Sequence, residues 1–198
     1  STTLINKFFY NNDLIDPKKF DKYFLNNPNF VYEEYFNYLK SFNITDNIIT
    51  DKSPLNFRWI GFIKKLFPNS KIIHCNRNPK DICLSLYKNA FDGDKLNWTY
   101  DEEDIRQYYT LYKNLMNFWT KIYGDSIYTV QYEKLVSDQE NEIKNLINHC
   151  DLAWNEKCLN FHKNKKTPIK TASISQARKE IYSSSINSNI LYDKYLDK

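Results

Sequence analysis

Two apolar segments rich in β-forming residues constrain the fold of this chain more than any other feature. They are KIIHCNR at 71–77 and SIYTVQY at 126–132, and each becomes polar at its C-terminal end. Between them, Pro79 stands where the first turn of a helix tolerates proline. The longer segment 101–122 opens with acidic residues that suit the positive end of a helix dipole. Strands that alternate with helices predict an α/β fold, a parallel sheet with helices on both faces.

Polar side chains gather where the predicted strands end. The clusters are Asp51-Lys52-Ser53 (after the short apolar run NIIT at 47–50), Asn76-Arg77-Asn78 and Gln131-Tyr132-Glu133. Ligands of parallel sheets bind beyond the carboxyl ends of the strands. The sequence therefore predicts a functional site at this edge of the sheet.

Two cations in these clusters suit an anionic ligand. Lys52 would bring a compact charge to a bridging or transferring oxygen, although a surface lysine in a turn is the simpler interpretation. Arg77 presents a planar fork of donors beside a predicted helix N-terminus, with Ser85 about two turns further along that helix. The alternative for Arg77 is a structural ion pair with Asp81 or Asp92.

The segment 163–179 is basic and rich in hydroxyl groups. Cations and hydroxyls together suit phosphate or sulfate, whereas charged runs are more often solvated loops. The residues of interest here are Thr171, Ser173, Ser175 and Arg178.

Glycine is scarce, with three in 198 residues, and neither GxxxxGK[ST] nor GxGxxG occurs. Any phosphate site must therefore use side chains or a loop outside this chain. The three histidines are scattered and the four cysteines form no CxxC pair, so we expect no metal site.

The net charge of +4 and the pI of about 8.7 suit an anionic small ligand or substrate and fall short of a nucleic-acid footprint. We therefore expect no nucleic acid partner. No apolar run approaches 18 residues and no signal peptide pattern is present, so we expect no membrane span and a cytoplasmic location. The abundance of Asn, Lys, Ile and Tyr favours an AT-rich genome and a bacterial source.

The segment TDKSPLNFRWIGFIKKLFPNSKIIHCNRNPKDICLSLY resembles the sulfotransferase family, in particular the branch of protein-tyrosine sulfotransferases and of bacterial enzymes fused to tetratricopeptide repeats. VQYEKLV, CDLAWNEKCLNFH and KTASISQARKEIY continue the resemblance in the same order, so that it covers 46–185. The resemblance implies a P-loop nucleotide kinase-like fold. It also implies in-line transfer of a sulfuryl group from 3′-phosphoadenosine 5′-phosphosulfate (PAPS) to a hydroxyl acceptor, such as a peptide tyrosine, a carbohydrate or a small molecule. The product would be adenosine 3′,5′-bisphosphate (PAP).

The resemblance also implies roles for individual residues. Lys52 would neutralise the bridging oxygen of the phosphosulfate, and Ser173 would support it there as the second catalytic residue. Arg77 and Ser85 would hold the 3′-phosphate, and Tyr132 would lie near the nucleotide. The complete set of cofactor-binding residues would be Lys52, Arg77, Ser85, Tyr132, Ser173, Ser175 and Arg178.

This sequence departs from the family at its N-terminus. The family opens with a strand and a loop of the type PRSGTT, followed by a Gly-Glu pair whose Glu is the general base in the tyrosine-sulfating branch. Neither occurs here, so we expect an N-terminally incomplete domain without the first strand and the phosphosulfate loop. Glu33 and Glu34 lie on a predicted helix and are poor substitutes for the base.

We expect a single sulfotransferase domain over 1–198, made of a helical segment (1–45), the family core (46–185) and a C-terminal helix (186–198). Tetratricopeptide repeats could precede it in the full-length protein. The alternative is a non-catalytic nucleotide- or partner-binding domain derived from a sulfotransferase, which the intact Lys52, Arg77 and Ser173 disfavour.

Overall fold

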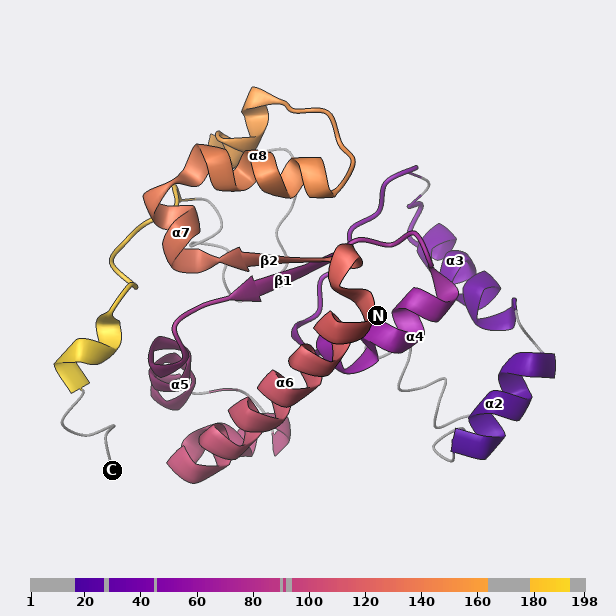
Figure 1. The fold of residues 1–198 in the computed structure, drawn as a ribbon, viewed down its shortest axis with the longest axis horizontal. Coiled ribbons are helices and arrows are strands. Elements are labelled where there is room, and N and C mark those ends of the chain that lie inside the picture. Colours follow the sequence, from indigo (N-terminus) through magenta and orange to yellow (C-terminus); the bar gives the residue numbers. More distant parts are fainter. Residues whose placement is uncertain are drawn as a thin grey trace. The chain divides into compact units, whose positions relative to one another are not determined.

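The structure is a computed structural model that describes residues 17–26, 29–44, 46–89, 91, 94–163 and 179–192. The chain forms two compact units, Ser1–Ser70 and Lys71–Lys198. Figure 1 shows their elements along the chain. None of the described helices is long and apolar enough to cross a membrane.

The first unit is helical, with its helices joined by aromatic rings. The ring of Phe67 lies 5.5 Å from that of Tyr32, 5.3 Å from that of Tyr35 and 6.2 Å from that of Phe36. This cluster packs α3 (Phe30–Ser41) against the end of α4 (Ile60–Leu66). The elements are α2 (Pro17–Asn26), α3 (Phe30–Ser41), η1 (Pro54–Trp59) and α4 (Ile60–Leu66).

The apolar run at 47–50 does not form the strand that the sequence suggests. Residues 47–53 have no regular structure, and Ile48 is 63% exposed. A strand needs a neighbour for its backbone groups, and β1 and β2 are the two strands of the described chain. Asp51 instead anchors this segment, accepting hydrogen bonds from Tyr35 Oη at 3.2 Å and Asn56 Nδ2 at 3.3 Å.

The second unit contains a parallel pair of strands in register. The strand β1 (Ile72–Asn76) pairs with β2 (Ile127–Gln131), from Ile72 opposite Ile127 to Asn76 opposite Gln131. The helices of this unit are α5 (Pro79–Lys88), η2 (Asp94–Tyr100), α6 (Glu102–Tyr123), η3 (Gly124–Ser126), α7 (Tyr132–Ser137), α8 (Gln139–His149), η4 (Glu156–Cys158), η5 (Phe161–Lys163) and η6 (Ser188–Tyr192).

Helices cover both faces of this small sheet, as predicted. His74 of β1 hydrogen-bonds Tyr112 of α6 and lies 3.3 Å from Thr129 Oγ1 in the neighbouring strand. Tyr128 of β2 donates to Glu142 of α8 at 3.0 Å. Because successive side chains of a strand point to opposite faces, α6 and α8 lie on opposite sides of the sheet (Figure 1).

Asparagine and aspartate side chains cap the N-termini of two helices that the sequence predicts. The side chain of Asn78 accepts from the amides of Lys80 at 2.9 Å and Asp81 at 3.4 Å at the start of α5. Asp101 does the same for Asp104 at 2.9 Å at the start of α6. Such a cap contributes about 1 kcal/mol to helix stability. The buried apolar residues of this unit come from α5, α6, β2 and α8, and they are Leu84, Ile105, Met116, Val130 and Ile143.

The C-terminal helix predicted over 186–198 is present as a short 3₁₀ turn. Asn187 has a φ of 58°, a left-handed conformation that asparagine tolerates better than most residues, and η6 (Ser188–Tyr192) follows it. Residues 193–198 of the predicted helix lie outside those described.

Candidate functional site

The strand register brings Arg77 and Tyr132 together. Asn76 and Gln131 are paired, so the residues that follow them leave the sheet side by side. The guanidinium carbon of Arg77 lies 5.2 Å from the centre of the Tyr132 ring, within the range of a cation–π contact. Figure 1 shows both strand arrowheads pointing toward this end of the sheet. Two of the three predicted polar clusters thus meet here.

Arg77 is oriented by contacts on one side of its guanidinium group. Its Nη2 donates to the carbonyl of Ser185 and lies 3.6 Å from Oδ2 of Asp81. Its Nε is buried and has no hydrogen-bond partner among the described residues. A buried N–H without a partner is costly, and a phosphate oxygen is the kind of acceptor that an arginine fork prefers. Nε is therefore a donor that no described residue uses.

The ion pair considered as an alternative for Arg77 is also present. Asp81 is the partner, whereas Asp92 lies outside the described residues. The pair involves Nη2 alone, so that Nε–H stays available. The structural and the ligand-binding interpretations of Arg77 are therefore compatible.

The amides at the start of α5 are engaged within the protein. Those of Lys80 and Asp81 bond the Asn78 side chain, and that of Asn78 itself donates to Oε1 of Glu133 at 2.8 Å. These amides are not free to bind an anion. The charge and donors of Arg77, more than the helix N-terminus that the sequence suggested, therefore define the anion site.

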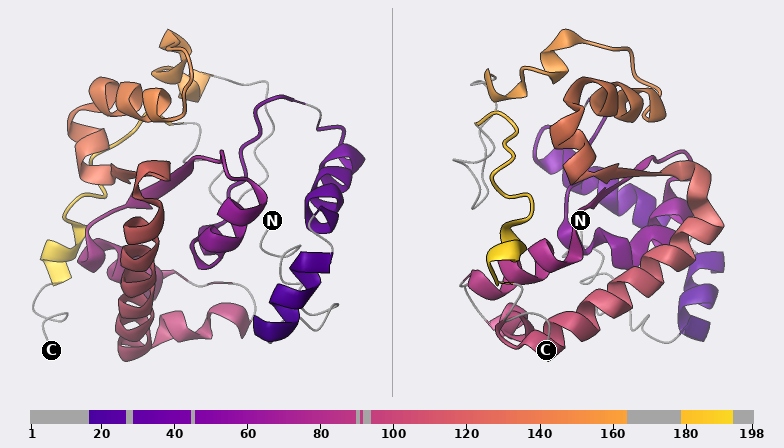
Figure 2. Two further views of the ribbon diagram at one scale, coloured as in Figure 1. Left: turned by 45° about the vertical axis from the view of Figure 1, so that its right-hand side comes forward. Right: turned by 60° about the vertical axis from the view of Figure 1, so that its left-hand side comes forward.

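The C-terminal segment 179–192 also contributes to the surroundings of Arg77, and the sequence did not predict these contacts. Tyr132 donates through its hydroxyl to the carbonyl of Tyr182 at 2.8 Å, and Ser185 receives the Arg77 bond described above. Figure 2 shows this yellow segment from two further sides. Backbone carbonyls leave no pattern in a sequence, so no signal pointed to Tyr182 or Ser185.

Asp81 was weighed only as an ion-pair partner, yet it is completely buried. It accepts from the amides of Asn187 and Asn189, both at 2.9 Å, and from Ser188 Oγ at 3.0 Å. Burial alone would raise the pKa of this carboxyl, but the three hydrogen bonds and the charge of Arg77 outweigh it and hold the pKa below its usual value. Asp81 is therefore a charged group within the unit.

Among the other predicted residues, Ser85 is the one that the structure describes in the same unit. Ser85 is exposed, and its hydroxyl lies 3.5 Å from Nδ2 of Asn89, one turn along α5. Lys52 is exposed in the first unit. The predicted residues Ser173, Ser175 and Arg178 lie outside the described part of the chain.

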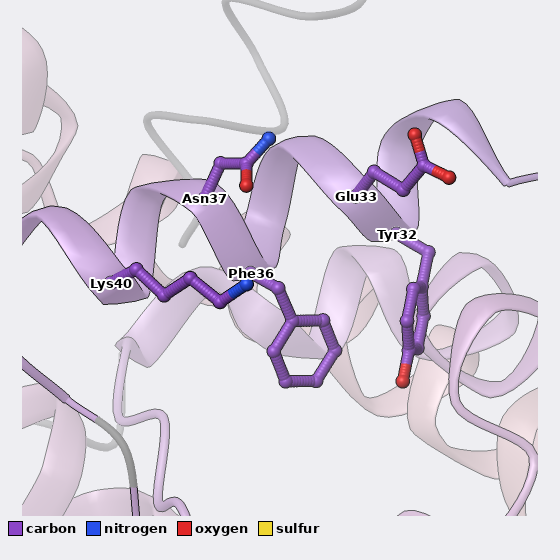
Figure 3. A pocket seen from close by; sticks show the side chains of 5 residues that line it. All are labelled: Tyr32, Glu33, Phe36, Asn37 and Lys40. Atoms are coloured by element: carbon purple, nitrogen blue, oxygen red, sulfur yellow. The ribbon is translucent and has the colours of Figure 1, made fainter.

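The first unit carries an open pocket on α3, which Figure 3 shows. The rings of Tyr32 and Phe36 point to the same side, with centres 4.6 Å apart, and Glu33 lies beside them. None of the predicted site residues lines this pocket. Among the described residues there is also no group of three or more His, Cys, Asp or Glu side chains that could hold a metal.

Comparisons with known proteins show the family of this chain. A model of the sulfotransferase family matches residues 8–156. An uncharacterized protein of Aquifex aeolicus (strain VF5) is 37% identical over 150 residues, which cover 75% of this chain and 20% of that protein. A Caenorhabditis briggsae protein named "Putative protein-tyrosine sulfotransferase" is 26% identical over 114 residues, 58% of this chain and 40% of that protein. The matches thus span less than half of either relative. Because the family model covers most of its length, this chain belongs to the sulfotransferase family.

Proposed function

We propose that this chain carries the 3′-phosphate-binding part of a PAPS-dependent sulfotransferase. The observation that carries the proposal is the buried Nε of Arg77, which has no acceptor among the described residues while Nη2 is already engaged. An oriented guanidinium with a free donor suits a phosphate monoester, whose oxygens accept charge-assisted hydrogen bonds. Membership of the sulfotransferase family supports the same conclusion.

Each predicted residue has a defined task in this proposal. Arg77 binds the 3′-phosphate, Ser85 contributes its exposed hydroxyl to the same group, and the Tyr132 ring lies against the nucleotide. Lys52 and Ser173 bind the reacting sulfate, where cationic and hydroxyl donors stabilise developing negative charge. When bound, PAPS supplies the activated sulfuryl group.

Two further residues and a further loop complete the proposed site. Ser175 and Arg178 belong to a segment that closes over the nucleotide. The 198 residues contain no glycine-rich phosphate loop pattern. We therefore propose that the 5′-phosphosulfate is bound by another part of a longer protein, in which tetratricopeptide repeats could also occur.

The proposed acceptor is a hydroxyl group, either of a peptide tyrosine or of a carbohydrate or small molecule. The name of the C. briggsae relative favours tyrosine. The net charge of +4 suits an acidic peptide around that tyrosine, because opposite charges steer association.

Calorimetric titration of the 198-residue chain with PAP tests the proposal. We expect wild-type protein to bind PAP and Arg77→Ala to weaken binding about 10- to 100-fold, because a hydrogen bond to a charged group contributes about 1.5–3 kcal/mol. Arg77→Lys should recover only part of the affinity, since lysine lacks the planar fork.

The matched control is Arg106→Ala. This exposed arginine of α6 pairs with Glu102 one turn away, so its loss changes the net charge equally without touching Arg77. If both alanine variants weakened PAP binding equally, the affinity would depend only on the net charge of the protein. Wild-type protein that fails to bind PAP would exclude the 3′-phosphate site in this chain.

A further inference from the structure

The two carboxylate oxygens of Asp81 are both occupied by the C-terminal segment. Oδ2 accepts from the amide of Asn187, and Oδ1 accepts from Ser188 Oγ and from the amide of Asn189. The left-handed φ of 58° at Asn187 helps to turn these backbone amides toward one point, as in an anion-binding nest. The anion in this nest is a side chain of the protein itself.

The same carboxylate also acts on Arg77. Oδ2 lies 3.6 Å from Nη2, and that nitrogen donates to the carbonyl of Ser185, which belongs to the segment that Asp81 binds. Asp81 and Ser185 thus hold the Nη2 side of the guanidinium from two directions. They leave its buried Nε without a partner among the described residues.

The segment is fastened on both sides of Asp81. Upstream, the carbonyl of Tyr182 accepts the hydrogen bond from Tyr132 at 2.8 Å. Downstream, the ring of Tyr192 lies 4.7 Å from Nζ of Lys88 at the far end of α5. Asp81 is the only fully buried contact of the three, and charged hydrogen bonds are stronger where water is excluded.

The geometry points to Asp81 as a positioning residue, which fastens 185–189 to α5 and thereby orients Arg77. The segment lies beyond residues 8–156, which match the family model. On the proposed function, a phosphate ester at Arg77 and the docking of 185–189 strengthen each other, since coupling between two binding events is reciprocal.

The first experiment uses ligand-free protein and measures amide hydrogen exchange at Asn187 and Asn189 by NMR, together with the Nε–H signal of Arg77. Asp81→Asn preserves the shape of the side chain but removes its negative charge. It also places an NH₂ group among the three donors of residues 187–189. We expect it to lower the protection of both amides about tenfold and to weaken or shift the Nε–H signal.

Asp101→Asn is the matched control, because Asp101 likewise lies at a helix start but is exposed and bonds only its own helix among the described residues. It should leave all three signals unchanged. A purely structural role of Asp81 would lower protection throughout the unit, including Val130 in β2, and would overturn the inference. Unchanged signals in Asp81→Asn would overturn it as well.

The second experiment adds PAP. We expect Asp81→Asn to weaken PAP binding about tenfold, and PAP to raise protection of Asn187 and Asn189 in the wild type alone. Ser188→Ala removes one of the three donors and should weaken binding about threefold, which keeps the inference testable if Asp81→Asn does not fold. If the wild-type protein does not bind PAP, the proposed function is wrong. The NMR signals of the ligand-free protein then still show whether Asp81 orients Arg77. If neither variant changes PAP binding, the proposed coupling between PAP binding and the docking of 185–189 is wrong.

Discussion

The surroundings of Lys52 and of Arg77 differ in how the protein holds each cation. Lys52 lies on irregular backbone, is exposed, and has no hydrogen bond or ion pair to another described residue. Arg77 stands between a paired strand and a capped helix and contacts Tyr132, Asp81 and Ser185.

The difference shows what pre-organises a charged side chain. A regular element fixes the backbone on each side of Arg77, and a distant segment fixes the guanidinium. In the first unit, the hydrogen bonds to Asp51 hold the neighbouring residue but not Lys52 itself. On the proposed function, the protein therefore orients Arg77 before a phosphate binds, whereas no described contact orients Lys52.

The largest expected effect is on stability. Arg77→Ala should lower the free energy of unfolding by about 2 kcal/mol, because the buried Asp81 loses its cation and the Ser185 carbonyl its donor. Lys52→Ala should change it by less than about 0.5 kcal/mol, as for most surface substitutions. Urea denaturation measures both, and similar losses would erase the distinction between the two regions.

A smaller difference in the free energy of unfolding is expected between the phenylalanine variants of two tyrosines. Each of these tyrosines donates a hydrogen bond to a carboxylate, one in each unit. Tyr128→Phe should cost about 1 kcal/mol, because Glu142 is buried and would keep only Lys134, at 3.2 Å, as its ion-pair partner among the described residues. Tyr35→Phe should cost about 0.5 kcal/mol or less, because Asp51 is exposed. If Tyr35→Phe proved the costlier change in urea denaturation, the first unit would be better ordered around Lys52 than we infer.

The smallest expected effect is the loss of stability at alkaline pH, when Tyr35 and Tyr128 ionise. Burial, followed by the bonded carboxylate, raises the pKa of both Tyr35 and Tyr128 to about 12. A raised pKa favours the protonated form in the folded state, so the stabilisation is complete below the ordinary value of about 10 and is lost as the pH rises toward 12. Titration followed by tyrosinate absorbance should show one late-ionising group fewer in each phenylalanine variant. A variant that titrates like the wild type would contradict the assignment of its tyrosine.

The sequence predicted the elements whose periodicity and end signals agree. Both strands and the helices that Asn78 and Asp101 cap follow from patterns that lie within a few residues of each other. The parallel pairing follows from the alternation of strands and helices along the chain. The meeting of Arg77 with Tyr132 follows from that pairing. The prediction of a strand at 47–50 was wrong, because an apolar run indicates burial only where a neighbouring element covers it, and Ile48 is exposed.

The C-terminal contacts could not be predicted for a different reason. Ser185, Asn187 and Asn189 act through backbone groups, which every residue possesses. Asp81 was visible in the sequence, but an aspartate in the first turn of a helix is common on dipole grounds alone. Its burial depends on a segment more than a hundred residues away.

The pairing of the two strands also sets rules for changing the length of this chain. Inserting one residue into β1 would send every later side chain of that strand to the opposite face, so that Arg77 would leave Tyr132. The irregular segments between the strands are not under that constraint, because lengthening an exposed loop costs little chain entropy. Length variation among relatives should therefore accumulate between the strands, while each five-residue strand keeps its length.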